Sequence, residues 1–272
     1  MCITTMWGAV AICGFAVVAR AAETPELKRS QQYGFCRLDF PVAGAPAFII
    51  LPEKQAGEGR RPWVWYAPTI GAYPNRNNGW LLSRLLARGF AVCGVNVGES
   101  YGSPKGVKTY DAFYEHVVKA YGLSPKACLL PQSRGGLMLY NWAATGDNAR
   151  RVACIGGIYP VCDLRSWPGL ARACPAYGLT AEQLGERLAE HNPIDRLAPL
   201  AKARVPILHL HGDADRVVPL GPNSQELIRR YKSLGGPAHL TIIPGKGHAE
   251  VPAYFHSEQL LAFFLAHGLE AD

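Results

Sequence analysis

Short apolar runs alternate with amphipathic stretches along most of this chain. Apolar runs bounded by turn residues are typical of buried strands, whereas apolar residues spaced three and four apart indicate helices. The pattern predicts eight strands, at residues 35–40, 47–51, 63–66, 90–97, 126–130, 152–158, 205–210 and 239–243. It predicts helices at residues 80–88, 110–121, 137–144 and 181–191. Strands that alternate with helices favour an α/β fold, here a doubly wound, mostly parallel eight-stranded sheet with helices on both faces.

Two segments interrupt this alternation. The first two strands are joined by residues 41–46, which are rich in turn formers, so we expect an antiparallel hairpin there. Residues 159–202 separate two strands by a long stretch that has only one helical pattern. Such a stretch is an insertion that does not belong to the repeating strand and helix units.

The most informative motif is a serine between a predicted strand and a predicted helix. Ser133 follows Pro131-Gln132 and precedes Arg134, Gly135 and Gly136. A tight turn at this place exposes the serine hydroxyl above a helix N-terminus, as in the nucleophile elbow G-x-S-x-G. Pro131 replaces the first glycine of that motif, while the two glycines after Arg134 allow the close packing that the turn needs.

Two later loops supply the groups that a serine nucleophile requires. A hydroxyl needs a base to take its proton and an acid to orient that base. The loop after residues 205–210 carries Asp213 and Asp215, and the loop after residues 239–243 ends in His248. The order serine, acid, histidine is the one found with a nucleophile elbow. Each loop follows a strand, so we expect all three groups at the carboxyl ends of parallel strands.

These motifs resemble the α/β-hydrolase superfamily over about residues 45–267, in particular its compact esterase, dienelactone-hydrolase and prolyl-oligopeptidase-like branch. The resemblance rests on the segments Gln-Ser-Arg-Gly-Gly (132–136), His-Gly-Asp-Ala-Asp (211–215) and Gly-Lys-Gly-His (245–248). It implies that Ser133 is the nucleophile, His248 the general base and Asp215 the orienting acid. Asp213 is the competing acid, and in the family pattern the later aspartate takes the role, so Asp213 is expected to cap or brace its loop.

An oxyanion hole is also implied by the resemblance. One donor is expected to be the N–H of Arg134, directly after the nucleophile. The second should come from the loop after residues 63–66, where Pro68 has no N–H, so the donor is Thr69 or Ile70, with Ile70 favoured by the resemblance.

The resemblance further implies that residues 159–202 form a short cap beside an open cleft. Trp167 from this cap, and Glu99 and Tyr101 from the loop after residues 90–97, are the expected substrate-binding residues. Loop aromatic residues either serve as platforms for a sugar or aromatic ring or pack beneath their own loops, and both readings stay open for Tyr73, Tyr101, Tyr159, Trp167 and Tyr177. His209 and His211 border a strand and are expected to make structural hydrogen bonds.

Composition and charge restrict the kinds of partner that the protein is expected to bind. The 272 residues are 49% hydrophobic and 18% charged, which suits one large globular domain. The net charge of +7 is spread along the chain without a Lys/Arg-rich block, so no nucleic-acid partner is expected. No spacing of Cys and His resembles a zinc site, and we expect neither a metal nor a cofactor. The oligomeric state is left open.

The first 22 residues are expected to be a secretory signal peptide. An apolar run at residues 7–18 is followed by Ala-Arg-Ala (19–21), a small-x-small cleavage pattern, although a positively charged start is missing. The mature domain would then be residues 23–272, secreted or periplasmic, without stable membrane association after cleavage. An uncleaved membrane anchor is the alternative. Six cysteines remain after cleavage, and Cys162 and Cys174 are candidates for a disulfide.

The sequence thus predicts a secreted serine hydrolase, with a carboxylesterase for carbohydrate-linked or small-molecule esters as the main hypothesis. A prolyl-oligopeptidase-type peptidase is the first alternative, disfavoured because the residues before Arg61 are too few for a propeller domain. A non-catalytic binding protein on the same fold is the second alternative.

Overall fold

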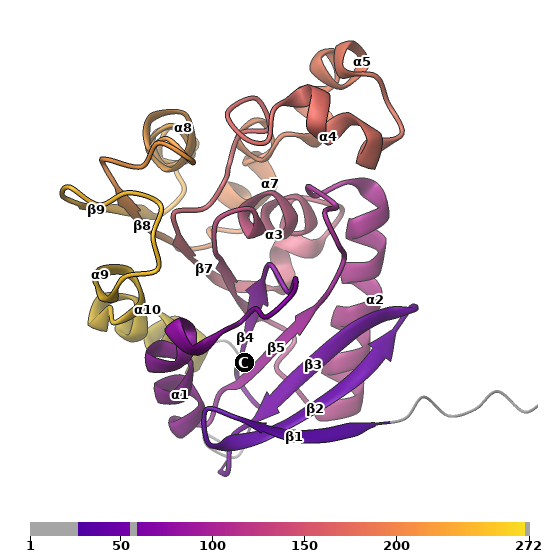
Figure 1. Cartoon of the computed structure of the whole chain (residues 1–272), viewed down its shortest axis with the longest axis vertical. Helices are drawn as coiled ribbons and strands as arrows, with labels where there is room; N and C mark the ends of the chain where they lie inside the picture. Colours follow the sequence, from indigo (N-terminus) through magenta and orange to yellow (C-terminus); the bar gives the residue numbers. More distant parts are fainter. Residues whose placement is uncertain (1–26, 55–58, 270–272) are drawn as a thin grey trace, which may run out of the picture.

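A mixed sheet forms the centre of the protein, as Figure 1 shows, in a computed structural model that describes residues 27–54 and 59–269. The strands are β1 (Lys28–Gln32), β2 (Phe35–Val42), β3 (Ala45–Leu51), β4 (Trp63–Ala67), β5 (Ala91–Val95), β6 (Ala127–Pro131), β7 (Val152–Ile158), β8 (Ile207–Gly212) and β9 (Ala238–Ile243). Their order is β1-β2-β3-β5-β4-β6-β7-β8-β9. The strands β5, β4, β6, β7, β8 and β9 run parallel to one another, while β3 pairs antiparallel with β5, and β2 and β1 continue the antiparallel edge.

Helices cover both faces of the sheet, and the alternation of side chains along the strands explains why. On β4, Trp63 and Trp65 pack with one hydrophobic cluster while Val64 and Tyr66 pack with another, and all four are fully buried. The first cluster includes side chains of α2 (Pro104–Tyr121), α3 (Gly135–Ala143), α7 (Ala198–Lys202) and α8 (Glu226–Ser233). The second includes side chains of α1 (Gly79–Ala87), α9 (Pro252–Phe255) and α10 (Glu258–Leu269). A parallel strand covered on both faces reads as a continuous apolar run, as the sequence does here.

The expected α/β-hydrolase fold is confirmed, with one strand more than the pattern indicated. The nine-stranded sheet contains β1, whose residues are polar and exposed. No hydrophobic alternation marks such a strand, because backbone hydrogen bonds to β2 hold it in the sheet.

The hairpin between β2 and β3 has a much shorter turn than the six residues expected. Both strands continue to its tip, where Pro41 lies opposite Pro46 in the register. Only Ala43 and Gly44 form the turn, with φ of 50° and 77°. Two successive positive φ values are typical of the tight hairpin turn that matches the twist of the strands.

Two helices also differ from their expected bounds. Helix α2 starts at Pro104 rather than at residue 110, because proline fits the first turn of a helix, where its missing N–H is not needed. The single helix expected at residues 181–191 is divided into α5 (Ala181–Glu186) and α6 (Leu188–His191).

The segment at residues 159–202 packs as a small layer of its own, seen above α3 in Figure 1. It contains α4 (Leu170–Tyr177), α5, α6, a short 3-10 turn η3 (Pro193–Asp195) and α7. Its buried apolar side chains contact Leu137 of α3 and Tyr101 of the loop after β5, forming a third hydrophobic cluster. The Tyr177 phenol also donates a hydrogen bond of 2.7 Å to the carbonyl oxygen of Tyr101.

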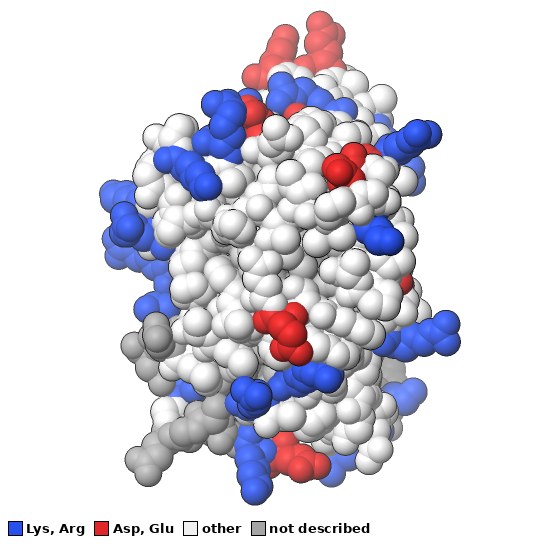
Figure 2. Space-filling view, turned by 90° about the vertical axis from the view of Figure 1, so that its left-hand side faces the viewer, with Lys and Arg blue, Asp and Glu red and all other residues white. Residues whose placement is uncertain are grey.

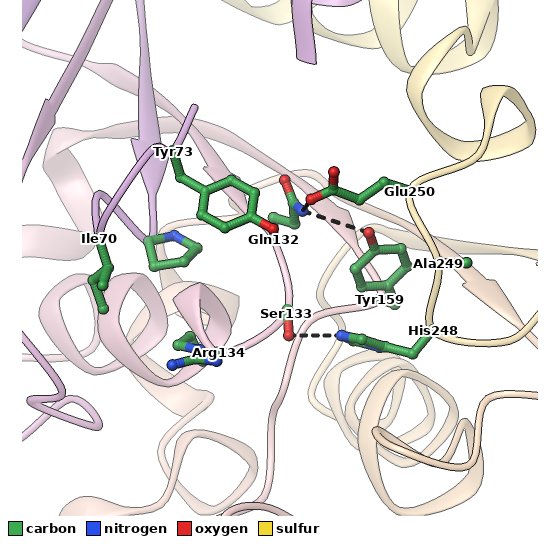
Figure 3. Close-up of a pocket in the computed structure, with 10 residues that line it drawn as sticks. Ile70, Tyr73, Gln132, Ser133, Arg134, Tyr159, His248, Ala249 and Glu250 are labelled. Atoms are coloured by element: carbon green, nitrogen blue, oxygen red, sulfur yellow. Dashed lines mark hydrogen bonds between the residues drawn. The ribbon is translucent and has the colours of Figure 1, made fainter. Parts of the chain in front are cut away.

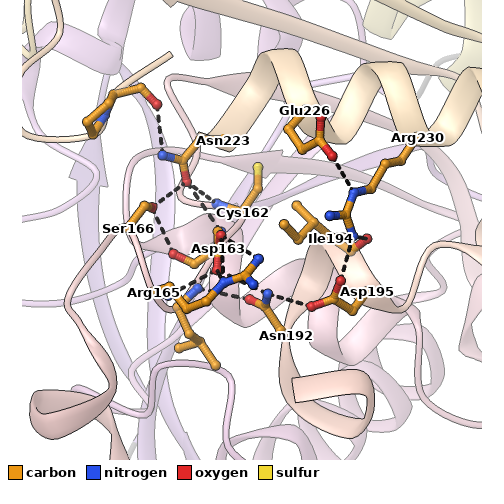
Figure 4. A network of polar contacts seen from close by, with 12 residues as sticks. Cys162, Asp163, Arg165, Ser166, Asn192, Ile194, Asp195, Asn223, Glu226 and Arg230 are labelled. Carbon is orange, nitrogen blue, oxygen red and sulfur yellow. Dashed lines mark hydrogen bonds and ion pairs between the residues drawn. The ribbon is translucent and has the colours of Figure 1, made fainter. Parts of the chain in front are cut away.

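A polar network fixes both ends of this segment, as Figure 4 shows. Near its start, the Asn223 side chain accepts hydrogen bonds from the Cys162 N–H at 2.8 Å and the Ser166 hydroxyl at 3.0 Å. Near its end, the Asn192 side chain donates to Asp163 at 3.1 Å and to Asp195 at 2.8 Å. Because the network joins segments far apart in the chain, it stabilises the position of the short helices on the sheet.

Cys162 and Cys174 do not form the disulfide considered above. Both are free thiols in the structure, as are the other four cysteines of the described residues. The Cys162 thiol is buried and donates to the carbonyl oxygen of Pro160, and the Cys174 thiol points to that of Ala171. Each thiol thus has its own acceptor within its loop or helix.

The expected signal peptide, residues 1–22, lies outside the described residues. In the described ranges, no helix combines the length and the apolar character needed to cross a bilayer. On the face shown in Figure 2, Lys and Arg side chains lie mostly toward the margin, with Asp and Glu among them. This view shows no large basic patch, while the partners and the localisation stay predictions.

Candidate active site

The turn between β6 and α3 holds Ser133 in a strained conformation. Its φ is 51°, in the left-handed region that non-glycine residues rarely adopt. The turn passes very close to other loops, since a Cβ atom on Gly135 would lie 2.0 Å from the carbonyl oxygen of Ala67. A Cβ atom on Gly136 would lie 2.2 Å from that of Val161. Both glycines are therefore required by packing, as the sequence indicated.

Three side chains from three different loops form a continuous chain of hydrogen bonds. The Ser133 hydroxyl lies 2.9 Å from Nε2 of His248, as Figure 3 shows. Nδ1 of the same ring lies 2.8 Å from Oδ2 of Asp215. In the tautomer that satisfies both contacts, Nδ1–H donates to the carboxylate and Nε2 accepts the serine proton. The three residues that the sequence singled out thus lie together in the geometry that activates a serine nucleophile.

The loop that carries Asp215 is fixed from both sides. Gly212 ends β8, and a Cβ atom there would lie 1.9 Å from the carbonyl oxygen of Lys246 in the histidine loop. The Asp213 carboxylate accepts a hydrogen bond of 2.7 Å from the N–H of Gly245. Asp213 therefore braces the two loops against each other, while Asp215 contacts the histidine.

The surroundings of Asp215 favour the ionised form of its carboxylate. Burial alone would raise its pKa, but hydrogen bonds from His211, His248 and the Val218 N–H outweigh burial and hold the pKa well below its usual range. The N–H groups of Val217 and Val218 both donate to Oδ1, at 2.9 and 2.8 Å. A permanently charged carboxylate can orient the imidazole and stabilise the imidazolium that forms during catalysis.

A buried row of polar side chains lies behind this loop. The Tyr140 hydroxyl is 2.6 Å from Nε2 of His209, and Nδ1 of that ring is 2.9 Å from the Ser224 hydroxyl. The same hydroxyl is 2.8 Å from Nδ1 of His211, whose Nε2 lies 2.8 Å from the carbonyl oxygen of Val218. With Tyr140, His209, Ser224 and His211 donating in that order, every group is satisfied. The structural role expected for the two histidines is confirmed.

Ser133 and His248 open into a cavity of about 320 Å³, which is within the size range of small-molecule sites. Its wall consists of Pro68, Ile70, Tyr73, Gln132, Ser133, Arg134, Tyr159, His248, Ala249 and Glu250. Among the described residues, no group of three or more His, Cys, Asp or Glu side chains is arranged to hold a metal ion.

Two backbone N–H groups at this cavity are available to an oxyanion. The N–H groups of Ser133 and Gly135 donate to backbone carbonyls, whereas the Arg134 N–H between them has no acceptor among the described residues. The same is true of the Ile70 N–H within the described part of the chain. Ile70 lines the cavity and Thr69 does not, since the Thr69 hydroxyl turns back to the carbonyl oxygen of Tyr66. The geometry favours Arg134 and Ile70 as the pair of donors.

The three expected substrate-binding residues do not line the cavity, which corrects that assignment. Tyr101 is only 6% exposed, because its ring packs under the cap segment and lies 5.9 Å from that of Trp167. Glu99 forms an ion pair with Arg134, whose guanidinium lies over the Trp167 ring, 5.2 Å from its centroid. Glu99 and Trp167 therefore hold Arg134, and Arg134 is the residue of this group that reaches the cavity.

Of the five aromatic residues considered as platforms, Tyr73 and Tyr159 line the cavity. The Tyr159 ring also packs against the imidazole of His248, with centroids 4.4 Å apart. Sequence reasoning missed Gln132 and Glu250 altogether. Gln132 directly precedes the nucleophile, and its side chain accepts from Tyr66 at 2.8 Å and donates toward Glu250 at 3.4 Å. The only signal in the sequence is proximity: Gln132 directly precedes Ser133, and Glu250 lies two positions after His248.

This site lies at the carboxyl ends of the parallel strands, and its serine, histidine and aspartate have the arrangement typical of the α/β-hydrolase superfamily. The model of the prolyl oligopeptidase family matches residues 107–268, more than half of the sequence, and the chain belongs to that family.

Solved structures with the same fold include both peptidases and esterases. A puromycin-hydrolysing peptidase of Mycobacterium tuberculosis has a TM-score of 0.62 and 19% identity, with 93% of this chain and 41% of that chain covered. An S-formylglutathione hydrolase of Agrobacterium tumefaciens has a TM-score of 0.65 and 15% identity, with coverage of 90% and 99%. A truncated carbohydrate esterase from gut microbiota has a TM-score of 0.64 and 19% identity, with coverage of 82% and 90%. This chain thus spans about 40% of the peptidase. No curated protein matches the chain.

Proposed function

We propose that this protein is a secreted carboxylesterase that hydrolyses carbohydrate-linked or small-molecule esters through an acyl-enzyme. The observation that carries the proposal is the hydrogen-bonded chain from Ser133 through His248 to Asp215 at the wall of an open cavity. The expectation of export rests on the sequence, namely on the apolar run at residues 7–18 and the small-x-small pattern at residues 19–21 that follows it.

In the first half-reaction, the Ser133 oxygen attacks the ester carbonyl while its proton passes to Nε2 of His248. The carbonyl oxygen becomes an oxyanion, held by the N–H groups of Arg134 and Ile70. When the intermediate collapses, the bond to the alcohol oxygen breaks and the alcohol leaves with the proton from His248. A water molecule then gives a proton to His248 and attacks the carbonyl carbon of the acyl-enzyme. When this second intermediate collapses, the bond to the Ser133 oxygen breaks, His248 returns the proton to that oxygen, and the acid leaves.

The structural neighbours include both esterases and peptidases, so their likeness supports hydrolysis of an ester and of a peptide alike. The prolyl oligopeptidase family match keeps a peptidase as the second candidate. Both candidates use the same nucleophile, so substrates must separate them.

The test compares p-nitrophenyl acetate and butyrate with Ala-Pro-p-nitroanilide, using the protein from Glu23 onward. If the proposal is correct, the wild type hydrolyses the esters, and the rate falls at least about thousandfold in Ser133→Ala and in His248→Ala. Ser83→Ala, a partly exposed serine of α1, is the matched control and should retain full activity. Faster cleavage of the anilide than of both esters would favour the peptidase. Absence of all turnover and of labelling by a fluorophosphonate would refute both enzymes.

A further inference from the structure

The cavity wall carries a carboxylate that is held only by neutral groups. Oε2 of Glu250 accepts a hydrogen bond of 3.0 Å from the Asn75 side chain and another from the Asn77 side chain. Oε1 faces the Gln132 amide at 3.4 Å, and the Tyr73 phenol is hydrogen-bonded to Glu250 as well. Four donors occupy the acceptor positions of a carboxylate, so its orientation is fixed, but none of them neutralises its charge.

Glu250 forms no ion pair with any Lys, Arg or His of the described residues. The other carboxylate near this cavity is different, since Glu99 pairs with Arg134. Burial raises the pKa of Glu250, but the hydrogen bonds from Tyr73, Asn75 and Asn77 outweigh it and lower the pKa below its usual value. The cavity therefore contains one uncompensated negative charge, two residues along the chain from His248.

One partly exposed aromatic ring shares the cavity with this charge. Tyr73 lines the wall beside Glu250, as Figure 3 shows, whereas the Tyr159 ring is only 1% exposed and packs against His248. The hydrogen bond to Glu250 and burial raise the pKa of Tyr73 to about 12, so its phenol is neutral near pH 7. Neutral aromatic rings attract ammonium groups through their π faces, and a nearby carboxylate adds a direct charge attraction.

We propose that Glu250, with Tyr73, makes the site selective for esters that carry a positively charged ammonium group. The carboxylate acts through its field, because its acceptor positions are already filled. A substrate with a carboxylate of its own is repelled by the same charge. Glu250 is thus a specificity-determining residue, and this role rests on the proposed ester hydrolysis at Ser133.

Two p-nitrophenyl esters of equal shape test this proposal. The 4-(trimethylammonio)butanoate is cationic, and the 5,5-dimethylhexanoate replaces its nitrogen by carbon. The ratio of their kcat/KM values cancels any general loss of activity. A pair of opposite charges a few ångströms apart near a protein surface justifies a ratio of about ten or more in the wild type. Glu250→Gln should bring this ratio close to one, while Glu182→Gln, the same charge change on exposed α5, should leave it unchanged.

A general bracing role for Glu250 would lower both rates together and keep the ratio, which would overturn the proposal. If Glu250→Gln does not fold, salt provides a second measurement on the wild type. Raising NaCl from 0.05 to 0.5 M should reduce the ratio severalfold, because salt screens a charge attraction, and a constant ratio would contradict the inference.

A failure of the proposed ester hydrolysis would be recognised separately. In that case neither ester is turned over, and binding replaces turnover as the measurement. Calorimetric titration of Ser133→Ala with the two methyl esters should then still show about tenfold tighter binding of the cationic one. Equal affinity for both esters would refute the ammonium site itself.

Discussion

Acid should destabilise this protein through His209, which is fully buried. Burial, with a smaller contribution from neighbouring His211, lowers the pKa of His209 to about 3. In the neutral ring, Nε2 accepts from the Tyr140 hydroxyl and Nδ1–H donates to Ser224. A protonated Nε2 can no longer accept the hydrogen bond from the Tyr140 hydroxyl. The charged imidazolium would therefore lose this hydrogen bond, and it would also be buried away from water.

The sign and the size of the effect follow from the two pKa values. In the unfolded chain His209 should titrate near its ordinary value of about 6.5, well above its value in the folded protein. As the pH falls below about 6.5, the unfolded state binds the proton first, so stability is lost progressively toward pH 3. The slope approaches about 1.4 kcal/mol for each pH unit below pH 6.5, so His209 should cost roughly 3 kcal/mol of unfolding free energy between pH 7.5 and 4.5.

Urea denaturation followed by tryptophan fluorescence at pH 7.5, 6.5, 5.5 and 4.5 measures this free energy. Other groups also titrate in this range, so the relevant quantity is the difference between the wild type and His209→Gln. The variant should lose about 3 kcal/mol less than the wild type on acidification, whatever its stability at pH 7.5. His239→Gln, at an exposed position of β9, should follow the wild-type curve. Parallel curves for the wild type and His209→Gln would refute the reasoning.

Two further predictions concern the catalytic loops. Gly135→Ala places a Cβ atom 2.0 Å from the Ala67 carbonyl oxygen, so we expect a loss of about 1–3 kcal/mol in stability and a severe loss of the proposed hydrolase activity. Gly221→Ala, where a Cβ would meet nothing within 4 Å, should change neither quantity in the same denaturation and ester assays. Asp215→Asn should lower kcat about thousandfold or more, because the imidazole loses the charge that orients it. Asp213→Asn should cost less than about tenfold, and equal losses in the two variants would contradict the roles assigned to them.

The parts of the fold that could be predicted are those that a local pattern specifies. The eight predicted strands are apolar or alternating runs, all but β9 bury side chains on one or both faces, and their periodicity marks them without knowledge of their neighbours. The nucleophile turn was recognisable for a similar reason, since the close approach of Gly135 and Gly136 to other loops excludes any side chain at those positions. The order of Ser133, Asp215 and His248 along the chain then restricted the choice of partners.

The parts that could not be predicted depend on contacts between distant segments. Glu250 and Asn75 are 175 positions apart, and neither residue lies in a motif that indicates their hydrogen bond. Glu99 was expected to face the substrate because of its loop, but the charge of Arg134 attracts it instead. Tyr101 has φ of 49°, and its ring turns into a cluster that forms only when the cap segment packs on α3. Such outcomes are decided by competition among neighbours in the folded protein.

The polar side chains of β1, which kept it from being predicted as a strand, also affect how the sheet can associate with other molecules. This strand ends the sheet, and its outer backbone groups would be a template on which a strand of another molecule could add. Lys28 and Arg29 are exposed on it, and charged side chains at such a border make that addition unfavourable. At the opposite border, β9 exposes 46% of Ile242. Fibril formation or strand exchange between copies should therefore begin at β9, and the polar border should remain inert.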